Sequence, residues 1–520
     1  MHYLVSLTII FGLCSIKSPV ASTVRLHHPT DDTTNNGVVF DVNILQTTDI
    51  HGWITGHRHQ PTYNCDIGDV YSFTTHMREL ANNRNSSFMM FDSGDLIEGT
   101  GISDATEMHG LYIFKTLTHL NYDGLAVGNH DVGHKDVTKY IHETFAPHWG
   151  SNYITSNVLW AENGKPLGGS QYQVQTTLPG MRVLKLGFLY KFLEHTSNVV
   201  VVPPVKSVKE EYFRKAMAEA VDLIVVIMHI APDMEDMNYI HTAIRRAQPD
   251  VAIAFLAGHS HVMRFHAVDQ NAFVIQSDHY LYHLGVAKFL LVDGKITHLY
   301  HKQIRCNRTA LASYVGEPTN EFQLPGGYAL KKDLARWTEE LSLDTVVGQM
   351  QHTYSKSLQV YNKWSLRNLF VEHVIPKTLF AETPLKHKPF YISGAFFLRD
   401  NLYQGNVTEA DIYAVIPFTD KFHQYEEVQG TVLIALVRKL LSKASQNWGG
   451  PAWFVTQEWI EPDTTYTVVG TVYDFFKLDA QVKTIPGWTE VSSNITTIYG
   501  PRSALHTYIQ RSSVRSAVGA

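Results

Sequence analysis

Five short polar clusters, each following an apolar run, carry side chains that can bind metal ions. The clusters are Asp49-Ile50-His51, Gly94-Asp95, Gly128-Asn129-His130-Asp131, His229 and Gly258-His259-Ser260-His261. Carboxylate oxygens, imidazole nitrogens and an amide oxygen together suit zinc, manganese or iron. Any one cluster alone is more often a solvated loop or a hydrogen-bonded histidine. Five clusters in this succession favour a metal site.

The chemistry that this set of ligands favours is hydrolysis of a phosphate ester. A shared Asp can bridge two ions about 3.5–4 Å apart, and the pair can clamp a phosphate and activate a water for in-line attack. We therefore expect two divalent metal ions. Zinc is the simplest choice for a nitrogen-rich set, with manganese or iron as alternatives, because these ligands do not fix the metal.

The residues between the clusters predict the elements that bring them together. Apolar runs bounded by Gly, Asp or Asn are expected to be buried strands. They span residues 42–45, 88–91, 125–127, 183–189, 223–228, 251–256, 273–275 and 287–292. Longer helix-like segments separate them, which predicts an α/β sandwich. Ligand sites in open α/β sheets form outside the carboxyl ends of strands, so the five clusters should meet at one edge.

The chain divides into four predicted parts. Residues 1–22 are expected to be a secretory signal, because residues 4–14 are nearly all apolar but too few to span a bilayer. A retained anchor and a buried helix are the alternatives. Residues 40–305 form the first α/β domain, and residues 306–350 form a linker that contains a helix. Residues 351–520 show a second α/β pattern.

Composition narrows the class of partner. The net charge is -6 and no long basic run occurs, which argues against binding of nucleic acid. The 28 histidines mean that the net charge changes strongly between about pH 5 and pH 7. We expect no membrane span after signal removal, and the oligomeric state stays open.

Several features fit passage through the secretory pathway. N-x-[ST] triplets, which can accept glycans, occur at Asn85, Asn307, Asn406 and Asn494. Outside the predicted signal the only cysteines are Cys65 and Cys306, which could form one disulfide or stay free. The expected destination is the extracellular space, the cell wall or an acidic vacuole.

The five clusters, in this order, resemble the signature of the calcineurin-like metallophosphoesterases. That resemblance implies a four-layer α/β/β/α sandwich over about residues 42–300. It also implies two metal ions that share one carboxylate. The ligands implied for one ion are Asp49, His51, Asp95 and His261, and those for the other are Asp95, Asn129, His229 and His259. His130 would lie beside the phosphate, where it would stabilise charge or protonate the leaving oxygen.

The second half of the chain resembles the C-terminal domain of the 5'-nucleotidase family. The similar segments are Ser393–Arg399, Asn406-Val407-Thr408, Pro417-Phe418 and Tyr466–Gly470. The resemblance implies a smaller α/β domain that binds a nucleoside, so the expected partner is a small phosphate ester such as a nucleotide. The implied substrate-binding residues are Arg399, Phe418, Tyr473 and Asp479, with the two rings stacking on a base. Alternatively, Phe418 and Tyr473 are core rings.

Two positions depart from the family pattern. Lys477-Leu478-Asp479-Ala480 stands where the nucleotidases have Gly-Gly-Asp-Gly, and Gly133 stands where they have an Asp that orients the catalytic histidine. For His130 we expect Asp131, Asp123 or a water as the replacement partner. Asp131, the nearest of these in the chain, is therefore a second candidate catalytic residue.

Three functions follow from these patterns. The first is a two-metal phosphomonoesterase that hydrolyses nucleoside monophosphates by attack of a metal-activated water. The second keeps the metals but changes the substrate to a nucleotide sugar, a cyclic nucleotide or another phosphate ester. The third, of another class, is a metal-binding scaffold without turnover, which the departures at Gly133 and in residues 477–480 would suit.

Overall fold

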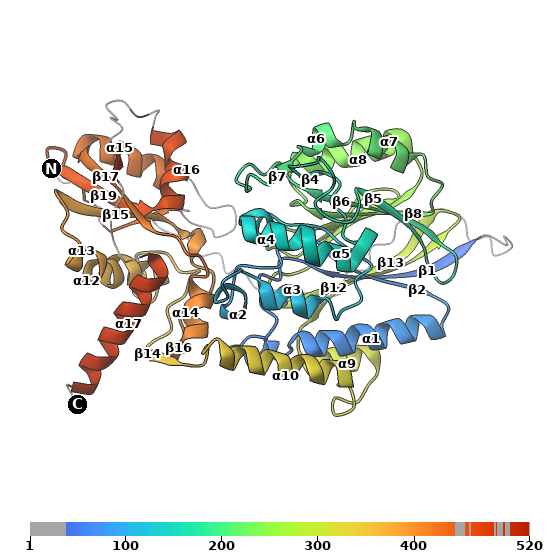
Figure 1. Ribbon diagram of the computed structural model, residues 1–520, viewed down its shortest axis with the longest axis horizontal. Helices are drawn as coiled ribbons and strands as arrows, with labels where there is room; N and C mark the ends of the chain where they lie inside the picture. The colour runs from blue at the N-terminus through green and yellow to red at the C-terminus, as the bar shows by residue number, and fades with distance from the viewer. Residues whose placement is uncertain are drawn as a thin grey trace, which may run out of the picture.

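The computed structural model describes residues 38–442, 453–456, 459–482, 485, 492–493 and 500–518. The predicted signal at residues 1–22 and the glycan acceptor Asn494 lie outside these residues. The described chain forms two α/β domains that lie beside each other along the long axis of the molecule (Figure 1). This confirms the predicted fold class.

Two sheets make up the centre of the N-terminal domain. The first sheet, in spatial order, contains β13 (Lys295–Arg305), β12 (His283–Val292), β1 (Val39–Thr47), β2 (Ser87–Asp92) and β3 (Gly124–Leu125). The second contains β10 (Arg264–Asp269), β11 (Ala272–Gln276), β9 (Ala252–Ala257), β8 (Leu223–His229), β6 (Arg182–Leu189) and β5 (Tyr172–Thr176). A separate ribbon pairs β4 (Val158–Trp160) with β7 (Val199–Val201). Every predicted apolar run overlaps one of these strands.

Helices cover the outer face of each sheet, which gives the four layers. The first sheet carries α1 (Ile67–Asn83), α3 (Leu111–Leu117), α9 (Arg308–Val315) and α10 (Pro325–Glu340), and the second carries α6 (Pro204–Ser207), α7 (Glu211–Met217) and α8 (Glu235–Ala247) (Figure 1). Alternate residues of one strand serve different cores, because successive side chains point to opposite faces. In β8, Val225 and Ile227 pack between the sheets, whereas Ile224 and Val226 pack beneath the helices.

Short helices occupy the connections near the carboxyl ends of the first sheet. They are α2 (Gly101–Asp104), α4 (Lys135–Tyr140) and α5 (Ala146–Trp149). The α2 segment follows the loop after β2 and is wholly buried. Its position matters for the site described below, because it supports the loop that contains Asp95 and Glu98.

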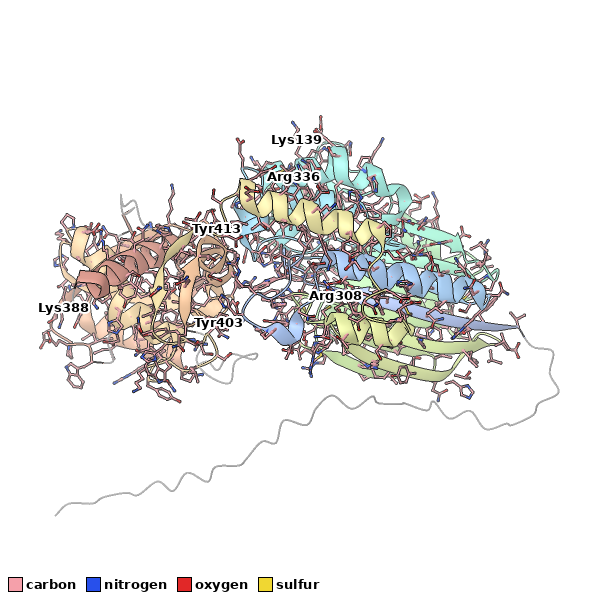
Figure 2. The ribbon with its side chains drawn as sticks, turned by 90° about the horizontal axis from the view of Figure 1, so that it is seen from below. Lys139, Arg308, Arg336, Lys388, Tyr403 and Tyr413 are labelled. Atoms are coloured by element: carbon pink, nitrogen blue, oxygen red, sulfur yellow. The ribbon has the colours of Figure 1, made fainter. Side chains whose placement is uncertain are left out.

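The predicted linker at residues 306–350 is mostly packed onto the first domain. Leu334 and Trp337 of α10 join the core that α1 and the first sheet enclose. Arg308 Nε and Lys331 Nζ both donate to Asp69 Oδ1 of α1, at 2.9 and 2.8 Å, and Arg308 lies beside α1 in Figure 2. These contacts make α9 and α10 part of the first domain's outer layer.

The C-terminal domain is built on a second five-stranded sheet. Its order is β18 (Trp453–Val455), β15 (Lys388–Gly394), β19 (Thr465–Thr471), β17 (Phe422–Gln429) and β20 (Ser492–Ser493), and a ribbon pairs β14 (Val346–Met350) with β16 (Gly405–Thr408). The helices are α11 (Leu366–Leu369), α12 (Ile375–Lys377), α13 (Leu379–Glu382), α14 (Glu409–Val415), α15 (Gly430–Leu441), α16 (Val472–Val482) and α17 (Pro501–Val518). Two separate apolar cores lie on the two faces of this sheet.

Cys65 and Cys306 lie side by side in the N-terminal domain. Both are buried, and the backbone N–H of Cys65 donates to the Cys306 carbonyl at 3.3 Å. The two thiols are hydrogen-bonded to each other and form no disulfide. Of the two alternatives that the sequence leaves open, the structure therefore has the free thiols.

Candidate metal centre

The five predicted clusters meet at one edge of the sandwich. Strands β1, β2 and β3 run parallel, as do β6, β8 and β9, so their carboxyl ends point to the same side. Asp49, His51, Asp95, His259 and His261 all have a positive φ, between 46° and 77°. This backbone region is uncommon for residues other than glycine and is concentrated at functional sites. The backbone conformation after each strand thus determines the direction in which these side chains point.

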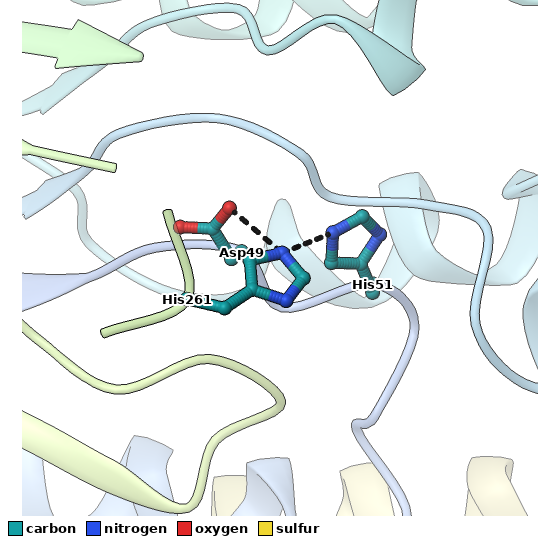
Figure 3. A group of neighbouring side chains, drawn as sticks. All are labelled: Asp49, His51 and His261. Carbon is teal, nitrogen blue, oxygen red and sulfur yellow. Dashed lines mark hydrogen bonds and ion pairs between the residues drawn. The ribbon is translucent and has the colours of Figure 1, made fainter. Parts of the chain in front are cut away.

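One group of candidate ligands consists of Asp49, His51 and His261 (Figure 3). His261 Nε2 lies 3.2 Å from Asp49 Oδ1 and 3.2 Å from His51 Nε2. His51 Nδ1 donates to the Ile97 carbonyl at 2.9 Å. Because a carbonyl only accepts, that hydrogen bond leaves Nε2 of His51 bare and available to a metal ion.

A second group consists of Asp95, His229 and His259, with Asn129 beside them. His229 Nε2 lies 3.1 Å from Asp95 Oδ2 and 3.2 Å from Asn129 Oδ1, and its Nδ1 donates to the Ser93 carbonyl at 2.9 Å. Asp95 Oδ2 is also 3.5 Å from His51 Nε2 in the first group. The two groups therefore adjoin at the carboxylate of Asp95.

The electrostatics of these side chains fit divalent cations. Burial lowers the pKa of His51 and of His261 well below the usual value and lowers that of His259 to about 4. These imidazoles are therefore neutral, as metal ligands must be. For His229, burial lowers the pKa, but the carboxylates of Asp95 and Asp49 outweigh it and raise the pKa to about 9. The same negative charge would attract a metal ion.

His130 has a different partner from those predicted. Its Nδ1 donates to Glu98 Oε2 at 2.5 Å, and its backbone N–H donates to Asp95 Oδ1 at 2.8 Å. Burial opposes ionisation of Glu98, but hydrogen bonds from His109, His130 and His134 hold the pKa of Glu98 well below its usual value. Glu98 is therefore an anion beside the imidazole of His130.

Neither predicted carboxylate partner contacts the imidazole of His130. Asp131 Oδ1 accepts the backbone N–H of Leu96 at 2.9 Å, and Oδ2 accepts those of Asp95 and Gly128 at 3.0 and 2.8 Å. Asp123 accepts from Arg78 and from the backbone of Met90. The prediction of Asp131 as a catalytic residue is therefore corrected: its carboxylate holds two ligand loops together.

Sequence reasoning missed Glu98 because the connection from β2 to α3 carries four acidic residues, Asp95, Glu98, Asp104 and Glu107. The one available signal was its place three residues after Asp95, in a loop already assigned to the site. Nothing in that spacing shows which carboxylate reaches His130. The loop geometry decides it, since Glu98 has a φ of 66° and its backbone N–H donates to Ser103 Oγ of α2.

The C-terminal domain brings two of its four predicted residues to this edge. Arg399 Nη2 donates to His130 Nε2 at 3.1 Å, and the Arg399 guanidinium lies 5.2 Å from the centroid of the Phe418 ring. The rings of Phe418 and His130 stack with centroids 6.0 Å apart. Arg399 Nε is buried without a hydrogen-bond partner. An anion between the domains would find an unused donor there.

Tyr473 and Asp479 are less directly connected to the site. Tyr473 is 41% exposed, so it is not a buried core ring, and it meets Phe396 edge-to-face at 5.0 Å. Lys477, one turn further along α16, forms an ion pair with Glu194 of the N-terminal domain. Asp479 lies within α16, and its side chain is outside the described part of the chain.

Comparison with known proteins matches both domains. Residues 42–263 match the family described as calcineurin-like phosphoesterase, and residues 353–461 match the family described as NAD nucleotidase, C-terminal domain. An uncharacterised protein of Schizosaccharomyces pombe is 29% identical over 74% of this chain and 69% of its own length. A protein of Arthroderma benhamiae described as a secreted protein is 25% identical, over 77% of this chain and 67% of its own length.

A solved structure extends the match to the whole described architecture. The crystal structure of 5'-nucleotidase from Candida albicans covers 91% of this chain and 98% of its own, with a TM-score of 0.82 and 25% identity. No helix in the described part of the chain is long and apolar enough to cross a membrane. Residues 42–263 thus form a calcineurin-like phosphoesterase domain and residues 353–461 a nucleotidase-type C-terminal domain, and the chain, similar over most of its length to a 5'-nucleotidase, is a metal-dependent phosphoric ester hydrolase.

Proposed function

We propose that the protein hydrolyses nucleoside monophosphates with two divalent metal ions, for which zinc is the first choice and manganese or iron the alternatives. Asp49, His51, Asp95 and His261 would hold one ion. Asp95, Asn129, His229 and His259 would hold the other. The observation that carries the proposal is the meeting of two ligand groups at one carboxylate, with Asp95 Oδ2 3.1 Å from His229 and 3.5 Å from His51.

The side chains around this carboxylate suit a phosphate that carries a leaving group. When bound, the two ions supply positive charge that polarises a phosphate and makes a nearby water more acidic. Arg399 would donate two hydrogen bonds to the phosphate. Its Nε has no partner, and its Nη2 would turn from His130 to the phosphate. His130, once protonated at Nε2 from solvent, would direct that N–H at the leaving oxygen and give it the proton, which returns the ring to the neutral Nδ1–H form.

The nucleoside would lie against the C-terminal domain. Phe418 is half-buried next to His130 and Arg399, so an aromatic face is available close to the proposed phosphate position. A base stacked on such a ring gains about 1–3 kcal/mol. Tyr473, which is partly exposed, is the proposed second ring, and Asp479 is the proposed ribose ligand.

The proposal is tested by phosphate release from AMP and from p-nitrophenyl phosphate, with zinc or manganese, in the wild type and in Asp95→Asn. We expect turnover of AMP that falls at least 10³-fold in the variant, because the shared ligand of both ions is lost. As a matched control, Asp250→Asn removes an exposed carboxylate of the same domain and should retain wild-type turnover. Absence of AMP hydrolysis by the metal-loaded wild type would contradict the proposal.

One observation favours the second function, a different phosphate ester. Residues 477–480 continue helix α16 without a break, whereas the resemblance implies a glycine-rich loop around the ribose carboxylate. If the protein uses no nucleoside pocket, AMP and p-nitrophenyl phosphate should be hydrolysed with similar kcat/KM. UDP-glucose and a cyclic nucleotide in the same assay would then identify the preferred class.

We further propose a secretory destination, outside the cell or in a vacuole, with glycans on the exposed side chains of Asn85 and Asn406. Asn307 is a poorer acceptor. Its Oδ1 caps α9 by accepting the backbone N–H of Ala310 at 3.2 Å, and its amide nitrogen, where a glycan would attach, donates to the Thr62 carbonyl. Treatment of the secreted protein with an endoglycosidase should release glycans from Asn85 and Asn406, as read by mass spectrometry.

A further inference from the structure

We infer that Glu98 is the residue that positions His130, in place of the aspartate that Gly133 replaces in this chain. The inference rests on the proposed function, because it assigns a role within the same site. Its basis is the 2.5 Å hydrogen bond from His130 Nδ1 to Glu98 Oε2. Gly133 has no side chain to offer, and Asp131 and Asp123 are engaged elsewhere.

The tautomer of His130 is defined from both sides of the ring. The Glu98 side chain accepts the proton on Nδ1 through Oε2. Arg399 can only donate, so its Nη2, 3.1 Å from Nε2, requires that Nε2 accept. Glu98 therefore keeps Nε2 directed at the space between the domains, 4.0 Å from Asp95 Oδ2. When Nε2 gains a proton, the Glu98 carboxylate stabilises the resulting imidazolium.

Glu98 itself is held in place by its surroundings. Oε1 accepts from His134 Nε2 at 2.6 Å, and the backbone N–H donates to Ser103 Oγ at 3.1 Å. The carbonyl oxygen of Glu98 lies 3.0 Å from His51 Nδ1. One residue thus orients the catalytic imidazole through its side chain and a proposed metal ligand through its backbone.

An additional metal ion is the rival explanation for this cluster. Glu98, His109 and His134 each offer a ligand atom within 4.8 Å of the others. However, two ligand atoms on one tetrahedral zinc ion lie roughly 3.3 Å apart, given bond lengths of about 2.0–2.1 Å. The 2.6 Å separation of Glu98 Oε1 and His134 Nε2 is that of a hydrogen bond. The geometry favours a hydrogen-bonded network.

The test compares wild type with Glu98→Gln on AMP and on p-nitrophenyl phosphate. Glu98→Gln replaces a charged acceptor by a neutral one, so the hydrogen bond that orients the His130 ring is weaker and Nε2 is less firmly directed at the leaving oxygen. We expect kcat on AMP to fall about 100-fold with KM within threefold. The loss on p-nitrophenyl phosphate should be less than fivefold, because nitrophenolate leaves without a proton. Metal content should stay at the wild-type value. Glu107→Gln, an exposed carboxylate of the same connection, is the matched control.

A second-site change gives a rescue. A Cβ at position 133 would meet nothing closer than the His130 carbonyl oxygen at 3.7 Å, and the backbone there is right-handed helical, with φ of -77°. Gly133→Asp is therefore tolerated sterically and puts a carboxylate at the family position. In the Glu98→Gln background it should restore kcat on AMP at least fivefold. A purely structural role of Glu98 would give no such rescue.

The outcomes separate this inference from the proposed function. Equal losses on both substrates, loss of a metal ion in Glu98→Gln, or wild-type kinetics in that variant would each overturn the inference. If the wild type hydrolyses neither substrate, the proposed function fails. The role of Glu98 is then tested by the imidazole nitrogen-15 shifts of His130, which report which ring nitrogen carries the proton. With His130 assigned by a His130→Gln variant, Nδ1–H in the wild type with a nitrogen-15 shift that changes in Glu98→Gln would support the inference. An unchanged Nδ1 shift would overturn it.

Discussion

Asp95 lies where the two groups of candidate metal ligands meet. Its Oδ2 lies between His229 and His51, at 3.1 and 3.5 Å, while Oδ1 accepts the backbone N–H of His130 at 2.8 Å. Burial opposes its ionisation, but the neighbouring imidazoles of His229 and His130 keep its pKa well below the usual value. The carboxylate is therefore ionised, as the proposed sharing of Asp95 between two cations requires.

Substitution of the single residue Phe418 tests the proposed nucleoside pocket. We expect Phe418→Ala to raise KM for AMP about 10-fold, because a stacked base loses one aromatic face worth roughly 1–3 kcal/mol. KM for p-nitrophenyl phosphate should change less than twofold. Steady-state kinetics on both substrates checks this, with Tyr361→Ala as a control at a ring that is 82% exposed. Equal changes on the two substrates would show that Phe418 supports the site without binding a base.

The positions of the metal-binding candidates could be predicted from sequence, whereas their hydrogen-bond partners could not. Asp49 follows β1 and His229 ends β8, and the parallel strands of each sheet end at the edge where the two residues meet. The misassignment of Asp131 has a simple cause. It is next to His130 in the chain, but the turn directs its carboxylate toward backbone N–H groups. Chain proximity does not specify side-chain direction.

At the scale of elements, most of the first domain was predictable because apolar runs dominate its strands. The run at residues 125–127 is the exception, since β3 contains only Gly124 and Leu125. The role of residues 306–350 was also not apparent. Glu317-Pro318 and Pro325 indicate chain breaks, and these breaks separate α9 from α10. The packing of both helices against α1 depends on contacts far apart in sequence, which no local pattern reveals.

Asp269 links β10 to α8 and supports a prediction on stability. Partial burial opposes its ionisation, but hydrogen bonds from Arg245 and His241 outweigh this and lower its pKa to about 2. Arg245 binds it with two nitrogen atoms, at 2.7 and 3.1 Å. Because the folded-state pKa lies below the unfolded value of about 3.9, Asp269 stabilises the fold above about pH 4. That contribution is lost as the pH falls toward 2.

We therefore expect Asp269→Asn to lower the free energy of unfolding by roughly 1–2 kcal/mol at pH 7. The difference from wild type should narrow between pH 4 and pH 3. Urea unfolding followed by circular dichroism at pH 7, 4 and 3 measures it. Asp250→Asn, which removes an exposed ion pair with Lys295, should change the free energy of unfolding little at any of these three pH values. A difference that is independent of pH would show that charge does not contribute.

At the scale of the whole molecule, the proposed active site is assembled from two domains. Polar contacts across the boundary include Lys477 with Glu194, His59 with Asp411 at 2.8 Å, and Arg399 with His130. Tyr403 stacks on His59 with ring centroids 4.5 Å apart and lies at the boundary in Figure 2. The proposed metal ligands all belong to the first domain, whereas Arg399 and Phe418, the proposed substrate contacts, come from the second. We therefore expect substitutions in the second domain to change substrate preference without changing metal content.

The metal content of the purified protein measures most directly whether two divalent ions share Asp95. Purified protein, loaded with zinc and freed of excess ions by gel filtration, should contain two ions per chain by mass spectrometry of the elements. Asp95→Asn should retain at most one, with the fold intact by circular dichroism. A wild type that contains one ion or none, or a variant that retains two, would rule out a pair of ions that share Asp95.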